Sequence, residues 1–446
     1  MTLPSLEDFL AKYIALESVS LAPRPGAMEK TAQFLVNHLQ AMNFFAEIVP
    51  IPDGHPIVFA HRRAASPRIR LLLYGHYDVQ PADPLEKWET DPFQLTVEDG
   101  IAHGRGVADD KGPMAAMLYG LADAGMDDAI DITVVIEGEE EIGSPHVEEF
   151  LKDKQICADA VLIADTGSIS DDIPALTTGL RSIVSFELTL RTGLRDLHSG
   201  FGGALPNAIH ELTRLCAKLH NKCGRVAVNG FYEDVTPPTK QEHLTFQFLE
   251  DFEVPFPEAM GTRAVANFFP LYLPRSIHAF MPSLEINGIR GGSAKTIIPA
   301  EASANITARV ANGQNPQKIA QLVEQFIRRH APKYADLTLA VKCFGAPYAI
   351  DFANVSSTFL ELFYRMEHSI ETAYGKAPLH LREGGSIGIV DAFKSICGAD
   401  SILVGAVPPD AQIHSPNEHI SMEILYRIQR MFKKFFSRIR LGNFTT

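Results

Sequence analysis

The segment that most constrains the fold is an apolar run, Leu-Leu-Leu-Tyr-Gly-His-Tyr-Asp, at positions 71–78. Continuous apolar runs are typical of buried parallel strands, and the carboxyl ends of such strands are where α/β sheets place their ligands. Gly75 breaks the run, and His76 and Asp78 follow as groups that could hold a metal ion. Taken alone, the pattern is more typical of a histidine hydrogen-bonded near a turn, so the prediction of a metal site depends on the rest of the chain.

Strand and helix patterns alternate through the first part of the chain and return near its end. Apolar runs predict strands at 46–49, 57–60, 69–74, 132–136, 161–164 and 402–405. Helical spacing of apolar residues predicts helices at 5–17, 29–42, 112–124, 356–374 and 422–439. Strands that alternate with helices predict an α/β fold with a doubly wound, mostly parallel sheet.

The pattern changes after residue 181. A strand with alternating polarity is followed by a helix with Pro206 in its first turn, and the order strand-helix-strand-strand-helix-strand then occupies 184–190, 206–220, 284–289, 302–310, 316–330 and 337–343. This order predicts a ferredoxin-like α+β domain inserted into the larger one. We expect residues 1–181 and 346–446 to form the main domain and 182–345 the inserted domain, with an elaborated loop at 230–282.

The composition excludes several classes of function. The chain has 446 residues, 46% hydrophobic and 21% charged, which is the profile of a globular protein. The net charge of −14 argues against a nucleic-acid partner, because phosphate binding needs clustered Lys and Arg. The five cysteines lack CxxC spacing, so neither a disulfide framework nor a thiolate zinc site is predicted. With no secretion signal and no run long enough to span a membrane, we expect a cytoplasmic protein.

Residues with metal-binding side chains recur at the ends of the predicted strands and in the loops beside them. Asp109 lies in a Gly-rich loop before a helix, Glu140 and Glu141 follow the strand at 132–136, Asp165 follows the strand at 161–164, and His414 follows the last strand. Singly, such motifs are most often turns or solvated acidic runs. Ionised carboxylates that crowd one edge of a sheet, however, need a compensating cation. Together with the histidine of the apolar run, they match a pair of divalent ions.

Five motifs in this order resemble the M20 family of two-metal peptidases and deacylases. They lie at 75–81, 104–112, 137–141, 382–386 and 414–415, and they span nearly the whole chain. The resemblance implies the ligand set. His76 and Asp165 would hold one ion, Glu141 and His414 would hold the other, and Asp109 would bridge the two.

The same resemblance implies roles for three further residues. Asp78 would orient His76, and Glu140 would be the general base that takes a proton from water and passes it to the leaving amine. The segment Asp-Leu-His-Ser-Gly at 196–200 is similar to the family's lid histidine, so His198 would donate to the oxyanion in the active site of a partner subunit. A homodimer formed through the inserted lid domain is therefore implied.

Other residues are similar to the carnosinase-like dipeptidases of this family. They are Gly-Leu-Arg at 179–181, Ala-Lys-Thr at 294–296, and Arg309. In that branch the lid threonine and arginine hold the terminal carboxylate of the substrate, so Thr296, Arg309, Gly385 and Ser386 would bind substrate here. Arg309 lies on the polar face of its predicted strand and is thus available for bidentate carboxylate binding.

We therefore expect a metal-dependent enzyme that hydrolyses the amide bond of small peptides, dipeptides above all. Zn²⁺ is the expected ion, and Mn²⁺ is the alternative, because imidazole and carboxylate ligands suit both. An N-acyl-amino-acid deacylase that removes acetyl or succinyl groups would use the same metal site and stays open as a second function. A non-catalytic protein that keeps the fold for binding would have no reason to retain a general base beside a metal ligand.

Overall fold

The computed structural model describes the chain except for residues 1–2, 126–128, 253–261, 264–268, 270–271 and 441–446. The chain divides into two compact units: the first comprises residues 1–178, 350–381 and 389–446, and the second comprises residues 179–349 and 382–388. The loop at 382–388 thus belongs to the second unit, although both of its flanks belong to the first. The limits expected from the sequence, 1–181, 182–345 and 346–446, stay a prediction of where the folding domains end.

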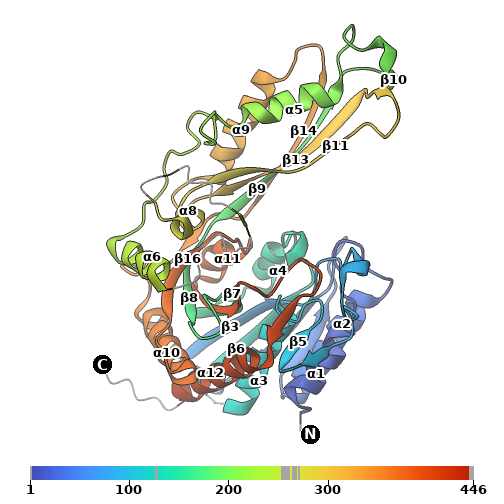
Figure 1. The fold of residues 1–446 in the computed structure, drawn as a ribbon. Helices are drawn as coiled ribbons and strands as arrows, with labels where there is room; N and C mark the ends of the chain where they lie inside the picture. Colours follow the sequence, from blue (N-terminus) through green and yellow to red (C-terminus); the bar gives the residue numbers. More distant parts are fainter. Residues whose placement is uncertain (1–2, 126–128, 253–261, 264–268, 270–271, 441–446) are drawn as a thin grey trace. The chain divides into compact units, whose positions relative to one another are not determined.

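The main sheet has the strand order β1-β2-β6-β3-β7-β17-β8-β15, with β16 also pairing with β8 and β15 spanning Tyr348–Ala349. Figure 1 labels β3, β6, β7, β8 and β16 of this sheet. The inner strands β6, β3, β7 and β17 are parallel neighbours, and β1, β2 and β8 join antiparallel. The predicted α/β fold with a mostly parallel centre is confirmed. The bounds are β1 Phe45–Val49, β2 Ile57–Arg62, β3 Ile69–His76, β6 Ile130–Glu137, β7 Ala160–Gly167, β8 Ala175–Leu180, β16 Leu379–Glu383 and β17 Ser401–Val407.

The inner strands read as continuous apolar runs because both of their faces are covered. β6 and β17 are buried at every position, and β3 is buried at every position except Arg70. The parallel register places His76 beside Glu137. The carboxyl ends of β3 and β6 therefore deliver their polar residues to the same edge of the sheet.

Helix α3 holds the centre of the first unit together. It is buried around nearly its whole circumference and packs against β3, β7 and α12. A Cβ on Gly120 would lie 2.6 Å from the carbonyl oxygen of Gln429, so only glycine allows α3 and α12 to approach this closely. The helices are α1 Leu6–Ile14, α2 Ala27–Ala41, α3 Lys111–Ala124, α4 Val147–Lys154, α10 Ser357–Tyr374, α11 Val390–Ala392 and α12 Met422–Arg440.

The second unit has the predicted ferredoxin-like order. Its antiparallel sheet runs β11-β13-β9-β14, and apolar residues of α5 and α9 share a core with the strands. One detail of the prediction is wrong: Pro206 precedes the N-cap of α5 and is not in its first turn, because the Asn207 side chain accepts the Ile209 N–H and starts the helix there. The bounds are β9 Ser182–Arg191, α5 Ala208–Lys218, β11 Ser283–Gly291, β13 Glu301–Val310, α9 Pro316–His330 and β14 Asp336–Phe344.

The stretch at 230–282, predicted as a loop, contains two helices among its described residues. They are α6 Lys240–Phe252 and α8 Pro274–Phe280. The helices pack on each other, with the rings of Phe246 and Phe280 5.5 Å apart. These phenylalanines contact each other between the two local helices, and their spacing obscured the helical periodicity in the sequence. Residues 253–261, 264–268 and 270–271 of this stretch lie outside the described part.

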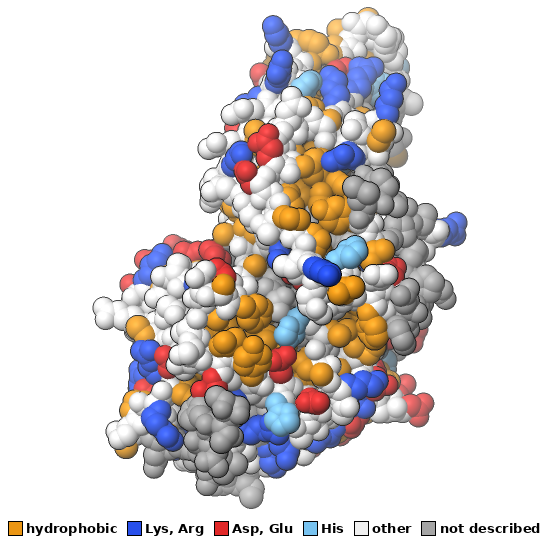
Figure 2. Space-filling model, turned by 90° about the vertical axis from the view of Figure 1, so that its left-hand side faces the viewer, with side chains coloured by type: hydrophobic (Ala, Val, Ile, Leu, Met, Phe, Trp, Pro, Cys, Tyr) orange, Lys and Arg blue, Asp and Glu red, His pale blue; other side chains and the backbone are white. Residues whose placement is uncertain are grey.

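Several short elements escaped the sequence patterns. The strands β4 Thr96–Glu98, β5 Ile101–His103 and β18 His419–Ser421 form a small sheet in the first unit, and β10 Leu197–His198 pairs with β12 Ile297–Ile298 in the second. Across the described residues, no helix combines the length and the apolar composition that a membrane crossing requires. Acidic and basic side chains are mixed over the face shown in Figure 2.

Candidate active site

Two groups of three side chains in the first unit can each hold a metal ion, and they share one residue. The first group is His76, Asp109 and Asp165, and the second is Asp109, Glu141 and His414. Within each group, the candidate ligand atoms lie within 4.8 Å of one another. The structure thus brings the five predicted ligands together.

Asp109 lies between the two groups with one carboxylate oxygen toward each. Its Oδ1 is 3.1 Å from Nε2 of His76, and its Oδ2 is 3.0 Å from Nε2 of His414. Asp165 Oδ2 is 3.8 Å from the same nitrogen of His76, and Glu141 Oε2 is 3.1 Å from that of His414. This is the arrangement that a bridging carboxylate between two ions requires.

The ligands come from separate segments that meet at one edge of the sheet. His76 is the last residue of β3, Asp109 lies two residues before α3, and His414 lies in the loop between β17 and β18. Glu141 belongs to a short 3₁₀ turn, Glu140–Ile142, directly after β6. Asp165 lies inside β7 and not beyond its end, because pairing with β17 extends that strand to Gly167.

Asp78 connects the histidine of the first group with the acidic turn. It is fully buried, and its carboxylate accepts the backbone N–H groups of Glu140 at 3.2 Å and Glu141 at 3.0 Å. Nδ1 of His76 lies 3.4 Å from Asp78 Oδ1 and 3.0 Å from the Asp78 carbonyl oxygen. Asp78 can therefore orient both His76 and the turn that carries the adjacent glutamates.

The two adjacent glutamates have different surroundings. Glu141 lies beside His414, and its Oε2 also accepts a hydrogen bond of 2.8 Å from Nε2 of Gln80. Glu140 belongs to neither metal-binding group. The difference matches the predicted order, with Glu141 as ligand and Glu140 as a free carboxylate, and the catalytic role of Glu140 stays a prediction.

Burial and mutual repulsion shift the pKa values of the carboxylates in this cluster. Burial raises the pKa of Asp165, and the neighbouring Asp109 and Asp110 raise it further. Burial also raises the pKa of Glu140, with Glu141 adding to the shift and His76 opposing it. At Asp109, burial acts in the same direction, but hydrogen bonds with His414 and His76 outweigh it and lower the pKa.

The donor set fits two divalent cations. Metal ligands must be deprotonated carboxylates and neutral imidazoles, and bound cations would relieve the repulsion that otherwise favours protons on these groups. The pKa of His414 illustrates the point: burial lowers it, yet hydrogen bonds with Asp109 and Glu141 raise it to about 10. A cation in this position would take the place of that proton.

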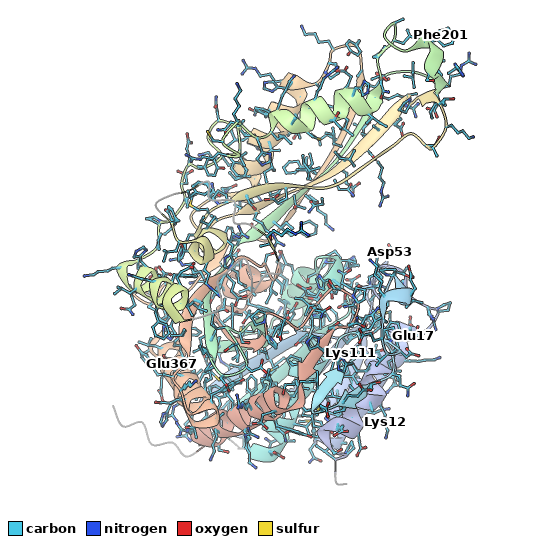
Figure 3. All side chains as sticks on the ribbon, in the orientation of Figure 1. Lys12, Glu17, Asp53, Lys111, Phe201 and Glu367 are labelled. Atoms are coloured by element: carbon cyan, nitrogen blue, oxygen red, sulfur yellow. The ribbon has the colours of Figure 1, made fainter. Side chains whose placement is uncertain are left out.

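His198 and Thr296 lie next to each other in the second unit. β10 pairs with β12, and the Ser199 N–H donates a 3.0 Å hydrogen bond to the Thr296 carbonyl. Both residues are exposed. Figure 3 labels Phe201, three residues after His198, at the tip of this unit. The structure thus brings the predicted lid histidine and lid threonine together.

Arg309, Gly385 and Ser386 form a separate cluster in the same unit. Nη1 of Arg309 donates a 2.9 Å hydrogen bond to Ser386 Oγ. The backbone N–H of Arg181 donates to the Gly385 carbonyl at 3.1 Å, and its Nε donates to the Gly384 carbonyl at 2.9 Å. Burial lowers the pKa of Arg181 to about 9, and the nearby charge of Arg309 adds to the shift.

These two clusters lie at opposite ends of β13. Thr296 precedes Glu301, the first residue of the strand, and Arg309 is close to its last residue. At about 3.3 Å per residue, the strand separates Glu301 from Arg309 by roughly 26 Å. Thr296 and Arg309 therefore do not grip the same small substrate within one second unit, a separation that the sequence prediction did not include.

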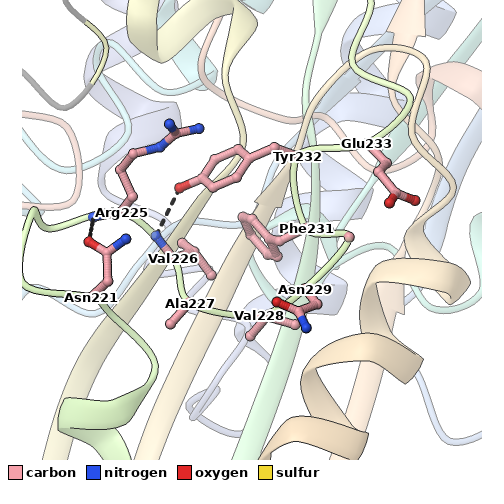
Figure 4. A pocket seen from close by; sticks show the side chains of 10 residues that line it. Asn221, Arg225, Val226, Ala227, Val228, Asn229, Phe231, Tyr232 and Glu233 are labelled. Atoms are coloured by element: carbon pink, nitrogen blue, oxygen red, sulfur yellow. Dashed lines mark hydrogen bonds between the residues drawn. The ribbon is translucent and has the colours of Figure 1, made fainter.

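A pocket of about 570 Å³ lies elsewhere in the second unit (Figure 4). The Tyr232 hydroxyl accepts the Val226 N–H at 2.9 Å along its wall. Residues Asn221 and Arg225–Glu233 line it. None of the predicted site residues does.

Comparison with known proteins agrees with this geometry. Residues 72–438 match the model of peptidase family M20/M25/M40. The chain is 29% identical to the human Beta-Ala-His dipeptidase over 96% of its own length and 88% of that protein. It is also 29% identical to the Cys-Gly metallodipeptidase DUG1 of Saccharomyces cerevisiae, over 82% of this chain and 78% of that protein.

Solved structures show the same likeness. Human carnosine dipeptidase 1 superimposes with a TM-score of 0.81 at 25% identity, covering 98% of this chain and 97% of that one. The dipeptidase Dug1p of Saccharomyces cerevisiae gives a TM-score of 0.83 at 25% identity, covering 97% and 96%. The ligand clusters and the family match over most of the sequence lead to one conclusion: this chain belongs to peptidase family M20/M25/M40.

Proposed function

We propose that the protein hydrolyses the amide bond of small peptides, dipeptides above all, with the help of two divalent ions. The observation that carries the proposal is Asp109, which lies within hydrogen-bonding distance of a histidine from each ligand group. Two relatives that match this chain over most of their own length are named as dipeptidases of Beta-Ala-His and Cys-Gly. The metal-binding groups support the hydrolytic chemistry, and the names of the relatives support a dipeptide substrate.

The residues of the first unit have separate roles in this reaction. His76, Asp109, Asp165, Glu141 and His414 would hold the ions, and bound ions would supply the polarisation of the scissile carbonyl and the activation of water at neutral pH. Glu140 accepts the proton of the attacking water and delivers it to the leaving amine.

Zn²⁺ is the ion that we propose, with Mn²⁺ as the alternative. Each group combines one histidine with two carboxylates. Imidazole is a common zinc ligand, and three protein ligands leave a position open for water or substrate, as catalytic zinc sites require.

Arg309 is the proposed anchor for the carboxylate at the substrate's C-terminus. Its guanidinium is partly buried and bonded to Ser386, and among the described residues no carboxylate lies within 4.0 Å of it. Arg181 is buried, and the positive charge of Arg309 lies near enough to lower its pKa, while Glu285 acts in the opposite direction. Two neighbouring guanidinium groups favour an anion, and a terminal carboxylate fits the planar fork of arginine.

His198 and Thr296 are proposed to act in the active site of a second copy of the chain. The length of β13 keeps them away from the Arg309 cluster of their own unit, yet the predicted chemistry needs all of them around one small substrate. A homodimer formed through the second unit meets both requirements. His198 would then donate to the developing oxyanion, where a positioned donor has its largest effect.

A cytoplasmic location is also proposed. Each of the five cysteines is free, and Cys157 and Cys223 are exposed. Exposed free thiols suit a reducing compartment.

The test is a substrate panel assayed with the metal content controlled. Beta-Ala-His and Cys-Gly are compared with N-acetyl and N-succinyl amino acids, before and after removal of ions by a chelator and after restoration with Zn²⁺ or Mn²⁺. We expect hydrolysis of the dipeptides that disappears with the ions and returns with them. Faster cleavage of the N-acyl compounds would identify a deacylase instead.

A further inference from the structure

Glu418 is a fully buried carboxylate that the proposed chemistry does not use. Its Oε2 is 2.7 Å from Nη1 of Arg105, which is also buried, and accepts the Gly106 N–H at 3.0 Å. Its Oε1 accepts the N–H groups of Ala108 at 2.9 Å and Asp109 at 3.2 Å. One carboxylate thus gathers four donors from the loop that carries the shared ligand.

The same carboxylate belongs to the loop that carries His414, four residues earlier. Arg105 completes the link, because its Nη2 donates to the Ser415 carbonyl at 3.1 Å, next to that histidine. The Gly104 N–H donates to the Glu418 carbonyl at 3.1 Å. The Asp109 loop is therefore joined to the His414 loop by the buried Arg105–Glu418 ion pair and by the backbone hydrogen bond between Gly104 and Glu418.

We propose that Glu418 is a positioning residue which, held by Arg105, sets the separation between Asp109 and His414 and so the affinity of the second ligand group for its metal ion. The inference rests on the two-ion site proposed above. Breaking a buried pair leaves an uncompensated charge, so both residues are needed together. Partners that orient metal ligands typically change metal affinity about 10–100-fold when they are lost.

The test measures Zn²⁺ binding to the full-length protein and to Glu418→Gln, by elemental analysis and by competition with a chromophoric chelator. Glutamine keeps the shape, but its NH2 group replaces one acceptor oxygen and faces either Arg105 and the Gly106 N–H or the N–H groups of Ala108 and Asp109. We expect the parent to hold two ions and the variant to lose one of them about 10–100-fold more readily. The ion of His76 and Asp165 is expected to be retained.

The matched control is Glu242→Gln in the second unit. Glu242 forms a similar, largely buried ion pair with Arg382 at 2.6 Å, far along the chain from any ligand. We expect this variant to bind both ions as the parent does. Equal weakening in both variants would show that the loss comes from any broken buried pair and would overturn the inference.

Two further outcomes also decide the matter. If Glu418→Gln binds both ions as tightly as the parent protein does, the positioning role is overturned. If the parent protein itself binds fewer than two ions, the two-ion proposal is overturned, and this inference with it. If Glu418→Gln does not fold, Arg105→Lys takes its place. Lysine keeps the positive charge but cannot bond Glu418 and the Ser415 carbonyl with two separate N–H groups as Arg105 does, so the same ion should bind more weakly; unchanged binding would overturn the inference.

Discussion

The two units of this protein arrange their functional residues in opposite ways. In the first unit, side chains from four other segments meet around Asp109. In the second unit, the length of β13 separates His198 and Thr296 from Arg309. A parallel sheet collects its strand ends at one edge, whereas a long antiparallel strand can serve two places, one at each end. The first unit can build a metal site alone, whereas the second unit separates its functional residues, which is the reason for the homodimer proposed above.

The largest expected effect concerns Glu140. Glu140→Ala should lower kcat by about 10²–10⁴ while both ions stay bound, because a proton-transfer group is lost and no ligand is removed. Steady-state kinetics and elemental analysis measure the two quantities. The control is Glu148→Ala, an exposed glutamate on α4, which should change neither. Near-normal kcat, or a lost ion, would mean that the roles of Glu140 and Glu141 are reversed.

His198 provides the sharpest test of the second unit. His198→Ala should lower kcat by about 10²–10³ with little change in KM, because a donor to the oxyanion acts mainly in the transition state. His210→Ala, an exposed histidine on α5, is the control.

Mixing the inactive Glu140→Ala and His198→Ala proteins then tests where His198 acts. A mixed dimer contains one site with an intact base and an intact partner histidine, so activity should return. If the subunits exchange and no activity returns, each chain completes its own site, and the comparison between the units is wrong.

Arg309 should affect binding more than turnover. Arg309→Ala is expected to raise KM by about 10–100-fold, the value of a hydrogen bond to a charged group, with kcat less affected. Dipeptides with an amidated C-terminus should show a much smaller change. Arg191→Ala at the other end of the same sheet, where Arg191 pairs with Glu301 at 2.7 Å, is the control. An equal rise in KM for amidated substrates would argue against carboxylate binding.

The last expected effect is on the acid stability of the first unit and does not involve the active site. Burial lowers the pKa of His38 from 6.5 to about 4, and its ring packs 4.3 Å from that of Phe9. Between these pKa values the unfolded chain binds a proton that the folded chain does not, so stability falls as the pH drops, by up to about 1.4 kcal/mol per pH unit. In His38→Phe, the free energy of unfolding, measured with urea, should depend less on pH between pH 6.5 and pH 4. An unchanged slope would show that His38 titrates normally.

The sequence predicted the first unit better than the second. Buried parallel strands such as β3 are marked by their apolar runs, and His76 follows from the end of that run. The separation of Thr296 from Arg309 is not visible in the same way, because it depends on which strands pair and over what length. The helices α6 and α8 escaped because their aromatic residues serve a local contact, and β4, β5 and β18 are too short to show a period.

Glu418 shows a second limit. Its place in the segment Ser-Pro-Asn-Glu is visible in the sequence, but its partner Arg105 lies in a distant loop. A buried ion pair has no periodic signal, since only tertiary contact distinguishes it from two surface charges.

The place of β17 in the sheet has a consequence for synthesis on the ribosome. β17 lies between β7 and β8, although residues 181–400 separate it from both in the sequence. The four strands of the ferredoxin-like sheet are complete by residue 344, so that sheet can form while β7 and β8 still present unpaired edges. The nascent chain must keep these edges from other partners until residues 401–407 emerge, and only then can α12 close over α3. The part of the protein that begins first is thus completed last.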